Sequence, residues 1–312
     1  MPQKYIAVTI DENYVQHCGV MLLSLFENNV GEKFHVFIIH NGITLPQQQL
    51  LKEQISLYNQ KVDFFLIDEN LLKNAPVSSH VSLATYYRIL LPEVLPAYVS
   101  KVLFLDCDII VRTSIVELWN EITEDFSHLA AENPLISDEF KLALGLSPES
   151  KYFNAGMMLI NLDYWRRFEL TKKSIDFIKS HKHKITFWDQ DVLNNLLEGR
   201  WKEISCRWNA QEVFFHPDFD AQKIGISETY YNEVRCHPYI VHFTGSNKPW
   251  FLDVEHPYKK DYLYYKAKSF WAVESLLQRV NMKPVTKKFS VRAYLKRKFY
   301  QLKSKIRKCV AS

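Results

Sequence analysis

The chain has 312 residues, 47% of them hydrophobic and 24% charged, so it can bury one large core or two smaller ones. A short apolar stretch near the N-terminus stops at Asp11, and no run of about 18 apolar residues occurs, which argues against a secretory signal and a membrane-spanning helix. Five scattered cysteines without a Cys-x-x-Cys pair argue against a disulfide framework and a zinc site, so we expect a reduced, cytoplasmic protein.

The net charge of +4 is unevenly distributed along the chain. Residues 275–312 contain twelve Lys or Arg residues and no acidic residue, so residues 1–274 carry a net charge of −8. The composition changes near Lys283, which predicts a globular domain over residues 1–282 and a basic tail over residues 283–312.

The first part of the chain alternates between apolar strand patterns and helical patterns. Strands are expected at 5–10, 34–39 and 62–67, and helices at about 14–28 and 47–57. This alternation predicts an α/β fold with a Rossmann-like, mostly parallel sheet covered by helices on both faces. Ligands of such sheets bind beyond the carboxyl ends of the strands. Asp11 and Asp106 each follow a predicted strand, so we expect them on one rim.

Two aspartates, Asp106 and Asp108, interrupt an apolar run at residues 101–111 that is typical of a buried strand. Two like charges at the end of a core strand favour a bound divalent cation, because an unpaired buried charge is costly. Successive strand residues alternate between faces, so a bend must bring both carboxylates towards one ion. A chance Asp-x-Asp in a plain loop is the alternative.

Later segments predict a buried strand at 155–162, a helix at 187–197 and a final strand at 238–243. Asp189 and Asp191 lie at the start of that helix, where an aspartate can also serve only as a cap. Residues 206–236 are rich in aromatic, Asn and Asp residues, and we expect them to form an irregular substrate loop.

Six segments together resemble the family 8 retaining glycosyltransferases, above all the bacterial lipooligosaccharide α-galactosyltransferase and related core glucosyltransferase branch. The likeness extends from about residue 4 to residue 265. The segments are Ile10–Tyr14, Tyr86–Arg88, Leu105–Asp108, Tyr152–Leu162, Trp188–Asp191 and His242–Trp250.

The resemblance implies a GT-A fold that binds a UDP-sugar with Mn²⁺, or with Mg²⁺ as the alternative cation. It assigns Asp106, Asp108 and His242 as metal ligands, a set that suits Mn²⁺ better than Zn²⁺. Lys248 matches a residue that meets the diphosphate, and Gly245 a backbone position close to the phosphates. Taken singly, His242 could instead be a core histidine.

The remaining donor contacts also follow from the resemblance. Thr9, Asp11 and Asn13 match positions that contact uracil and ribose, and Arg88 matches a donor-binding arginine. The family also places Asp106 at the donor, and it places four further residues around the transferred hexose. These four are Asn154, Ala155, Asp189 and Gln190. Gln190 and Asp189 are the predicted catalytic pair, whereas Asn154 on its own could be simple turn chemistry.

The basic tail has an amphipathic pattern. Five apolar residues recur at intervals of three or four and align on one helical face: Val291, Leu295, Phe299, Leu302 and Ile306. Basic residues lie beside or opposite this face, which is typical of helices at anionic membrane surfaces. The alternatives are nucleic-acid binding, which we do not expect, and a solvated tail.

The sequence therefore predicts a UDP-hexose-dependent glycosyltransferase that extends a lipid-linked saccharide at the inner face of the cytoplasmic membrane. A glycosyltransferase with a soluble or protein-linked acceptor is the nearest alternative. A nucleotidyltransferase would also use paired aspartates, but no Gly-rich phosphate loop follows the first predicted strand. The acceptor site is expected within residues 206–236.

Overall fold

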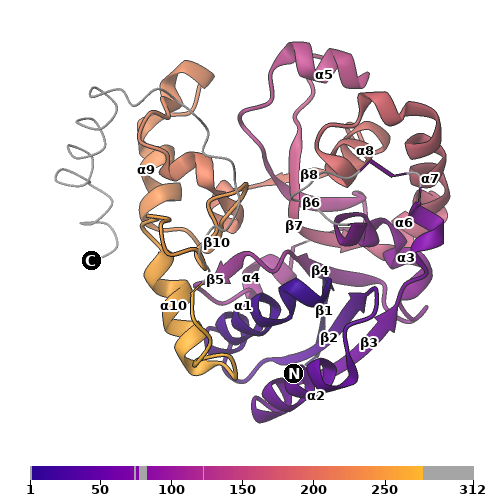
Figure 1. The fold of residues 1–312 in the computed structure, drawn as a ribbon. Coiled ribbons are helices and arrows are strands. Elements are labelled where there is room, and N and C mark those ends of the chain that lie inside the picture. The colour runs from indigo at the N-terminus through magenta and orange to yellow at the C-terminus, as the bar shows by residue number, and fades with distance from the viewer. Residues whose placement is uncertain (1, 74, 77–82, 122, 277–312) are drawn as a thin grey trace.

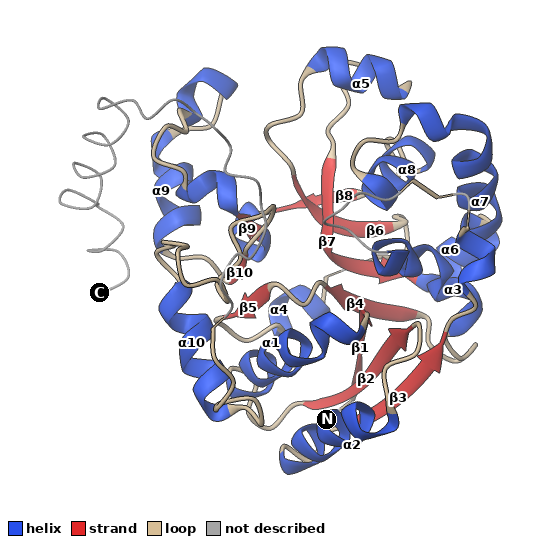
Figure 2. Ribbon diagram, in the orientation of Figure 1, coloured by secondary structure: helices blue, strands red, loops and turns tan. Residues whose placement is uncertain are grey.

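The computed structural model describes residues 2–73, 75–76, 83–121 and 123–276. These residues form a seven-stranded sheet of order β3-β2-β1-β4-β7-β6-β8 and a three-stranded sheet of order β5-β10-β9 (Figures 1 and 2). The predicted tail, residues 283–312, lies outside the described residues, so its boundary and its helix stay predictions.

The strands agree with the alternating pattern of the sequence. They are β1 (Gln3–Ile10), β2 (Lys33–His40), β3 (Lys61–Leu66), β4 (Lys101–Leu105), β5 (Ile109–Val111), β6 (His128–Glu132), β7 (Phe153–Asn161), β8 (Lys202–Ile204), β9 (Ala210–Gln211) and β10 (Ile240–His242). In the large sheet β3, β2, β1 and β4 are parallel to one another, and β6 is parallel to β8. The strand between these two groups, β7, is antiparallel to both β4 and β6. The prediction of a mostly parallel sheet is confirmed.

Helices pack on both faces of the large sheet (Figure 2). The α-helices are α1 (Val15–Glu27), α2 (Leu45–Leu57), α3 (Leu91–Val94), α4 (Val116–Trp119), α5 (Asp138–Leu144), α6 (Leu162–Arg167), α7 (Leu170–His181), α8 (Trp188–Leu196), α9 (Glu228–Cys236) and α10 (Lys259–Lys268). Short 3-10 helices are η1 (Glu12–Tyr14), η2 (Glu69–Leu72), η3 (Leu83–Leu90), η4 (Lys182–Lys184), η5 (Cys206–Asn209), η6 (Glu212–Phe215) and η7 (Ala221–Ile224).

The apolar residues of the central strands are buried on both faces of the sheet. Ala7 and Phe104 belong to the core cluster that also contains residues of α6, α7 and α8. Their neighbours Ile6 and Leu103 belong to a second cluster with residues of α1 and α2. This two-sided burial explains why these strands are continuous apolar runs rather than alternating ones.

The crevice of the sheet lies where the chain reverses direction. From β1 the chain proceeds outward through β2 and β3, then returns to place β4 on the other side of β1. The carboxyl ends of β1 and β4 therefore flank a topological switch point, the usual ligand site of open α/β sheets. Asp11 follows β1 and Asp106 follows β4, so the prediction that they share one rim is confirmed.

The apolar run at residues 101–111 is two strands, not one. β4 ends at Leu105, and Ile109–Val111 pairs with β10 in the small sheet. Asp106 and Asp108 occupy the turn between the two sheets, which supplies the bend that two carboxylates need in order to face one point. The small sheet has its own core, with residues such as Ile110, Phe214 and Phe243.

The prediction for residues 206–236 is only partly right. The segment contains short 3-10 turns and β9, but it ends in the nine-residue helix α9, begun by the Ser227 side chain, which accepts a hydrogen bond from the Tyr230 amide. Val234 is the buried residue of this helix, which explains why no apolar periodicity reveals it in the sequence.

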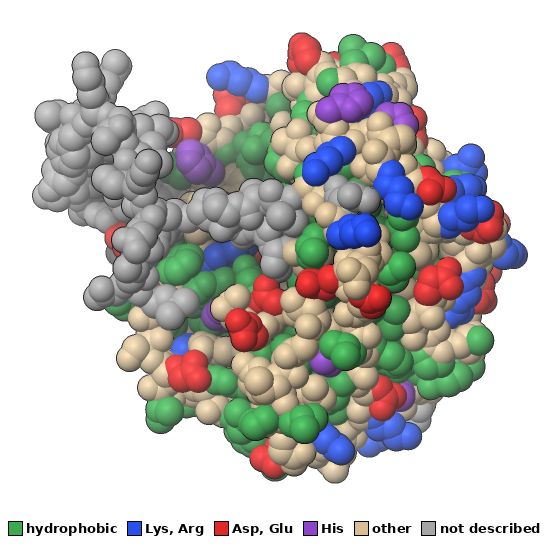
Figure 3. Space-filling model, turned by 45° about the vertical axis from the view of Figure 1, so that its right-hand side comes forward, with side chains coloured by type: hydrophobic (Ala, Val, Ile, Leu, Met, Phe, Trp, Pro, Cys, Tyr) green, Lys and Arg blue, Asp and Glu red, His purple; other side chains and the backbone are tan. Residues whose placement is uncertain are grey.

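No helix among the described residues is long and apolar enough to cross a bilayer. On the face drawn in Figure 3, acidic and basic side chains are interspersed with apolar ones. This mixture is ordinary for a globular surface.

Candidate active site

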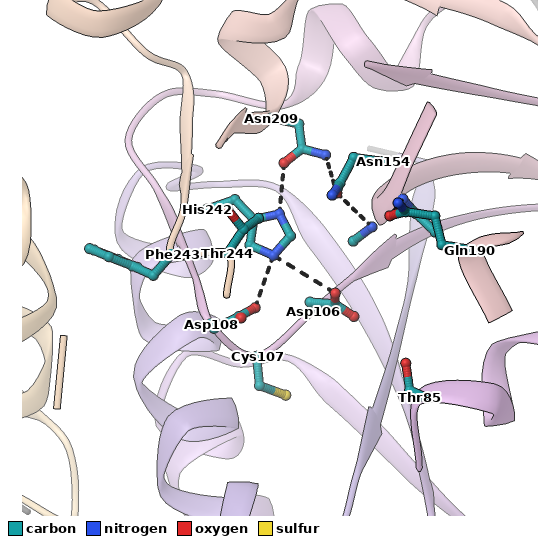
Figure 4. Close-up of polar contacts among 12 residues, drawn as sticks. Thr85, Asp106, Cys107, Asp108, Asn154, Gln190, Asn209, His242, Phe243 and Thr244 are labelled. Atoms are coloured by element: carbon teal, nitrogen blue, oxygen red, sulfur yellow. Dashed lines mark hydrogen bonds and ion pairs between the residues drawn. The ribbon is translucent and has the colours of Figure 1, made fainter. Parts of the chain in front are cut away.

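Three side chains meet at the junction of the two sheets (Figure 4). Asp106 and Asp108 come from the turn after β4, and His242 ends β10, where it pairs with Ile109 of β5. His242 Nε2 lies 3.2 Å from Asp108 Oδ1 and 3.8 Å from Asp106 Oδ2. One ligand atom from each residue falls within 4.8 Å of the others. The structure thus brings together all three predicted metal ligands.

Basic side chains surround the two carboxylates. Arg88 Nη2 donates to Asp106 Oδ1 at 2.9 Å, and Lys248 Nζ forms an ion pair with Asp108. Burial raises the pKa of Asp106 despite Arg88, and the charge of Asp108 raises it further. Burial acts in the same direction on Asp108, but the charge of the Lys248 ammonium beside it opposes burial, and the pKa of that carboxyl is lowered. The two carboxylates therefore titrate apart, as close like charges must.

The residues present fit a divalent cation. Asp108 Oδ1 is buried, faces the cluster and accepts no hydrogen bond from the described residues. Such an oxygen is costly without a partner, and a cation shared with Asp106 and His242 would supply one. Two carboxylates and one imidazole are a donor set for Mn²⁺ or Mg²⁺ with positions left for phosphate oxygens.

Gly156 is a site residue that sequence reasoning quoted in a motif but did not assign. A Cβ on this residue would lie 2.2 Å from His242 Cε1 and 2.7 Å from Asp106 Oδ2. Its carbonyl also accepts a hydrogen bond from the Asp106 amide at 2.8 Å. The β7 backbone therefore forms one wall of the cluster, and only glycine leaves room for the two ligands.

Asp189 is buried beside Arg88. Its Oδ1 accepts from Thr85 Oγ1 at 2.8 Å, and its Oδ2 pairs with Arg88 Nε at 2.8 Å. Arg88 thus bridges Asp189 and the metal-ligand candidate Asp106, and its guanidinium lies over the Phe104 ring. Burial raises the pKa of Asp189 to about 6, although Arg88 and Thr85 oppose the shift.

Asp189→Asn is expected to stabilise the fold more at pH 7 than at pH 4. A carboxyl whose pKa is higher in the folded than in the unfolded state destabilises the fold as pH rises between the two values. The pKa of this carboxyl rises from about 3.9 in the unfolded state to about 6 in the folded state, so above pH 6 its ionisation lowers the free energy of unfolding by on the order of 3 kcal/mol. The neutral amide of the variant carries no such cost. Urea unfolding of both proteins between pH 4 and 7.5 measures it, with exposed Asp125→Asn as the control. A stability difference independent of pH would contradict the expectation.

The predicted hexose contacts line the start of β7 and of α8. Ala155 N donates to Gln190 Oε1 at 3.1 Å, and Gln190 Nε2 donates to Tyr152 Oη at 3.3 Å. Asn154 Oδ1 accepts from the Gly156 amide at 3.0 Å. Asp191, for which the sequence also allows a role as a helix cap alone, is fully buried and accepts a hydrogen bond from the Tyr152 hydroxyl at 2.5 Å. Asp191 therefore holds in place the Tyr152 hydroxyl that Gln190 contacts.

The predicted nucleotide contacts lie at the carboxyl end of β1. Thr9 belongs to β1, and Asp11 begins η1 by accepting a hydrogen bond from the Asn13 amide at 2.9 Å. Tyr14 closes η1, and burial together with the charges of Asp108 and Asp11 raises the pKa of its hydroxyl. Cys107 Sγ, between the two aspartates, lies 4.0 Å from the Thr9 carbonyl oxygen, so Thr9 and Tyr14 adjoin the carboxylate cluster.

The loop after β10 carries the predicted diphosphate contacts. Gly245 has a φ of +72°, a left-handed conformation that explains the glycine on backbone grounds. Lys248 Nζ also donates to the Phe243 carbonyl at 2.7 Å. Trp250 closes the loop by stacking on His17 of α1, with ring centroids 3.6 Å apart. The loop is thus anchored to the helix that follows the predicted nucleotide contacts.

Comparison with known proteins agrees with the fold and the motifs. The model of glycosyl transferase family 8 matches residues 5–253. General stress protein A of Bacillus subtilis is 32% identical over 86% of this chain and 94% of its own length. Lipopolysaccharide 1,3-galactosyltransferase of Salmonella typhimurium is 30% identical over 88% of this chain and 81% of its own.

A solved structure extends the likeness to three dimensions. The galactosyltransferase LgtC, crystallised with donor and acceptor sugar analogs, matches with a TM-score of 0.76 at 23% identity, over 85% of this chain and 96% of that one. This match confirms the predicted GT-A fold. With the family model covering most of the sequence, the chain belongs to glycosyl transferase family 8 and is a glycosyltransferase.

Proposed function

We propose that the protein transfers a hexose, galactose or glucose, from a UDP-sugar to a saccharide acceptor, with retention of the anomeric configuration. The observation that carries the proposal is the Asp106, Asp108 and His242 cluster, flanked by Arg88 and Lys248 at the switch point of the sheet. The Salmonella relative is named for transfer to lipopolysaccharide, which supports a lipid-linked core saccharide as acceptor.

The site has the charge arrangement that departure of a nucleoside diphosphate requires. A divalent cation bound by Asp106, Asp108 and His242 would supply Lewis-acid stabilisation of the diphosphate. Lys248 adds a positive charge on the side of Asp108, and Arg88 adds one on the side of Asp106. The fold holds the Lys248 and Arg88 side chains in place before substrate arrives, so little reorganisation is needed when negative charge develops on the diphosphate.

Retention requires either a carboxylate nucleophile or attack on the same face as departure. Gln190 offers only an amide, a poor nucleophile, and the fold fixes its oxygen on the Ala155 amide. We therefore infer same-face attack, in which the UDP β-phosphate takes the acceptor proton and Gln190 stabilises the positively charged sugar. Asp189 would bind sugar hydroxyls. A glycosyl adduct trapped on Asp189 with a fluorinated donor would overturn this mechanism.

A panel of UDP-sugars tests the proposed reaction. Purified protein with Mn²⁺, and separately with Mg²⁺, is expected to hydrolyse UDP-galactose or UDP-glucose slowly and to transfer the hexose faster to truncated lipooligosaccharide. NMR of the product is expected to show an α-linkage. If the hexose is transferred only to a soluble or protein acceptor, the proposal of a lipid-linked acceptor is wrong. Turnover of nucleoside triphosphates alone would indicate a nucleotidyltransferase.

The basic tail supports a location at the inner face of the cytoplasmic membrane. Truncation after Met282 is expected to leave UDP-sugar hydrolysis unchanged, because the proposed donor contacts precede Trp250 in the sequence. Transfer to acceptor in anionic vesicles is expected to fall, because each cationic residue near the surface contributes on the order of 1 kcal/mol of attraction. Vesicle co-sedimentation of both forms, at low and high salt, measures the effect.

Equal sedimentation of the full-length and truncated proteins would exclude the tail as a membrane anchor. Binding of the full-length protein that persists at high salt would indicate that apolar insertion, not charge, dominates.

A further inference from the structure

His242 has two ring nitrogens with different neighbours (Figure 4). Nε2 faces the two carboxylates of the cluster, whereas Nδ1 lies 2.8 Å from Asn209 Oδ1. Asn209 is fully buried in η5, within the segment that the sequence assigns to the acceptor. A neutral imidazole can bind a cation only through the nitrogen that carries no proton, so the position of the proton decides whether His242 can serve as a ligand.

A backbone amide fixes the position of that proton through two asparagines. The Gly156 N–H can only donate, so the Asn154 atom 3.0 Å away must be the oxygen. Asn209 approaches this same oxygen at 2.9 Å, so the Asn209 atom there must be the NH₂ group. The other end of the Asn209 amide is then its oxygen, which accepts a proton from His242 Nδ1.

The result is a ring with its lone pair directed at the carboxylates. Asp108 Oδ1, 3.2 Å from Nε2, is then an acceptor facing an acceptor, which agrees with its lack of a hydrogen-bond partner among the described residues. Two lone pairs at this distance repel each other unless a cation lies between them. The hydrogen-bond chain therefore prepares a ligand, not an internal hydrogen bond.

We propose that Asn209 is a positioning residue of the metal site: the chain from Gly156 N–H through Asn154 and Asn209 holds the His242 proton on Nδ1 and keeps Nε2 free to bind the cation. The proposal deepens the proposed function and rests on its metal site. It also gives Asn154 a second task beside its predicted contact with the hexose. Partners that orient a metal-binding histidine typically contribute about 10- to 100-fold to metal affinity.

Two substitutions of Asn209 separate this role from a general contribution to folding. Asn209→Leu is close in size but offers no acceptor to Nδ1, so the proton is free to move to Nε2. Asn209→Asp keeps an acceptor on Nδ1 but brings its second oxygen against Asn154 Oδ1. Both variants are expected to lower the free energy of unfolding, because each leaves a buried polar group unsatisfied. Only the leucine variant is expected to lose metal affinity.

The experiment is Mn²⁺ titration of the full chain with UDP present, followed by EPR of free Mn²⁺. Asn209→Leu is expected to weaken Mn²⁺ binding about 10- to 100-fold, and Asn209→Asp is expected to stay within a few-fold of the unsubstituted protein. NMR of the ¹⁵N-histidine-labelled protein, with the His242 signal identified by its loss in His242→Gln, reports the proton directly. We expect the Nδ1–H form in the unsubstituted protein and the aspartate variant, and the Nε2–H form in the leucine variant.

A buried asparagine at the far end of β7 provides the matched control. Asn161 donates to the carbonyls of Thr123 and Phe126 and accepts from the Tyr164 amide. Asn161→Leu is expected to lower stability without changing Mn²⁺ affinity. Unchanged Mn²⁺ affinity in Asn209→Leu, or an Nε2–H ring in the unsubstituted protein, would overturn the proposal. If His242→Gln also binds Mn²⁺ normally, the metal assignment itself is wrong, which distinguishes the two failures.

Discussion

Asp108→Asn is expected to abolish hexose transfer while leaving the fold intact. The amide is nearly isosteric with the carboxylate, but it removes the negative charge that pairs with Lys248, and it can place an NH₂ group where a cation needs a ligand. Loss of one preorganised electrostatic contact costs about 10²- to 10³-fold in rate, and loss of a metal ligand is at least as severe. Transfer assays with saturating UDP-sugar measure the effect.

Binding measurements show whether the loss acts through the metal. In the unsubstituted protein EDTA is expected to weaken UDP binding strongly, whereas in Asp108→Asn it is expected to have little further effect. Thermal unfolding is expected to show a protein that still folds cooperatively but with reduced stability, because the lowered pKa of Asp108 means that its ion pair with Lys248 stabilises the fold, and the substitution leaves that ammonium without this partner. If the Asp108→Asn variant kept a transfer rate near that of the unsubstituted protein in the presence of EDTA, the assignment of Asp108 as a metal ligand would be contradicted.

The rim of the sheet could be predicted from the sequence because short, local signals define it. Strand β1 followed by Asp11, and β4 followed by Asp106, are apolar runs ended by a carboxylate. A parallel sheet necessarily brings such positions to one edge. The family motifs add His242, which lies more than a hundred residues from Asp106 in sequence and comes beside it through the pairing of β10 with β5.

The supporting residues carry no comparable signal. Asn209 follows a tryptophan in an aperiodic segment, and nothing in its neighbourhood distinguishes a buried asparagine from a turn residue. Its role depends on three hydrogen-bonded groups from β7, η5 and β10, and such an arrangement exists only after both sheets have formed. The sequence does not predict helix α9 for a related reason, since the single buried residue of this helix gives no helical periodicity.

Gly156→Ala is expected to cause a loss of transfer close to that of Asp108→Asn, although it changes no polar group. The added Cβ would lie 2.2 Å from His242 Cε1 and 2.7 Å from Asp106 Oδ2, so one or both ligands must move. The backbone cannot yield easily, because the Gly156 N–H is bonded to Asn154 Oδ1 and its carbonyl to the Asp106 amide. A displacement of about 1 Å in such a site costs about 10²-fold in rate.

Stability measurements isolate the steric cause. Gly156 lies inside β7 without a left-handed φ, so alanine is compatible with its backbone and would otherwise be slightly favourable. Overpacking at a buried position costs about 1–3 kcal/mol. In the His242→Ala background the ring is gone, so the cost of Gly156→Ala is expected to shrink to the part that Asp106 imposes, and the two substitutions are expected to be non-additive. Additive losses of stability would show that His242 does not occupy the space beside Gly156.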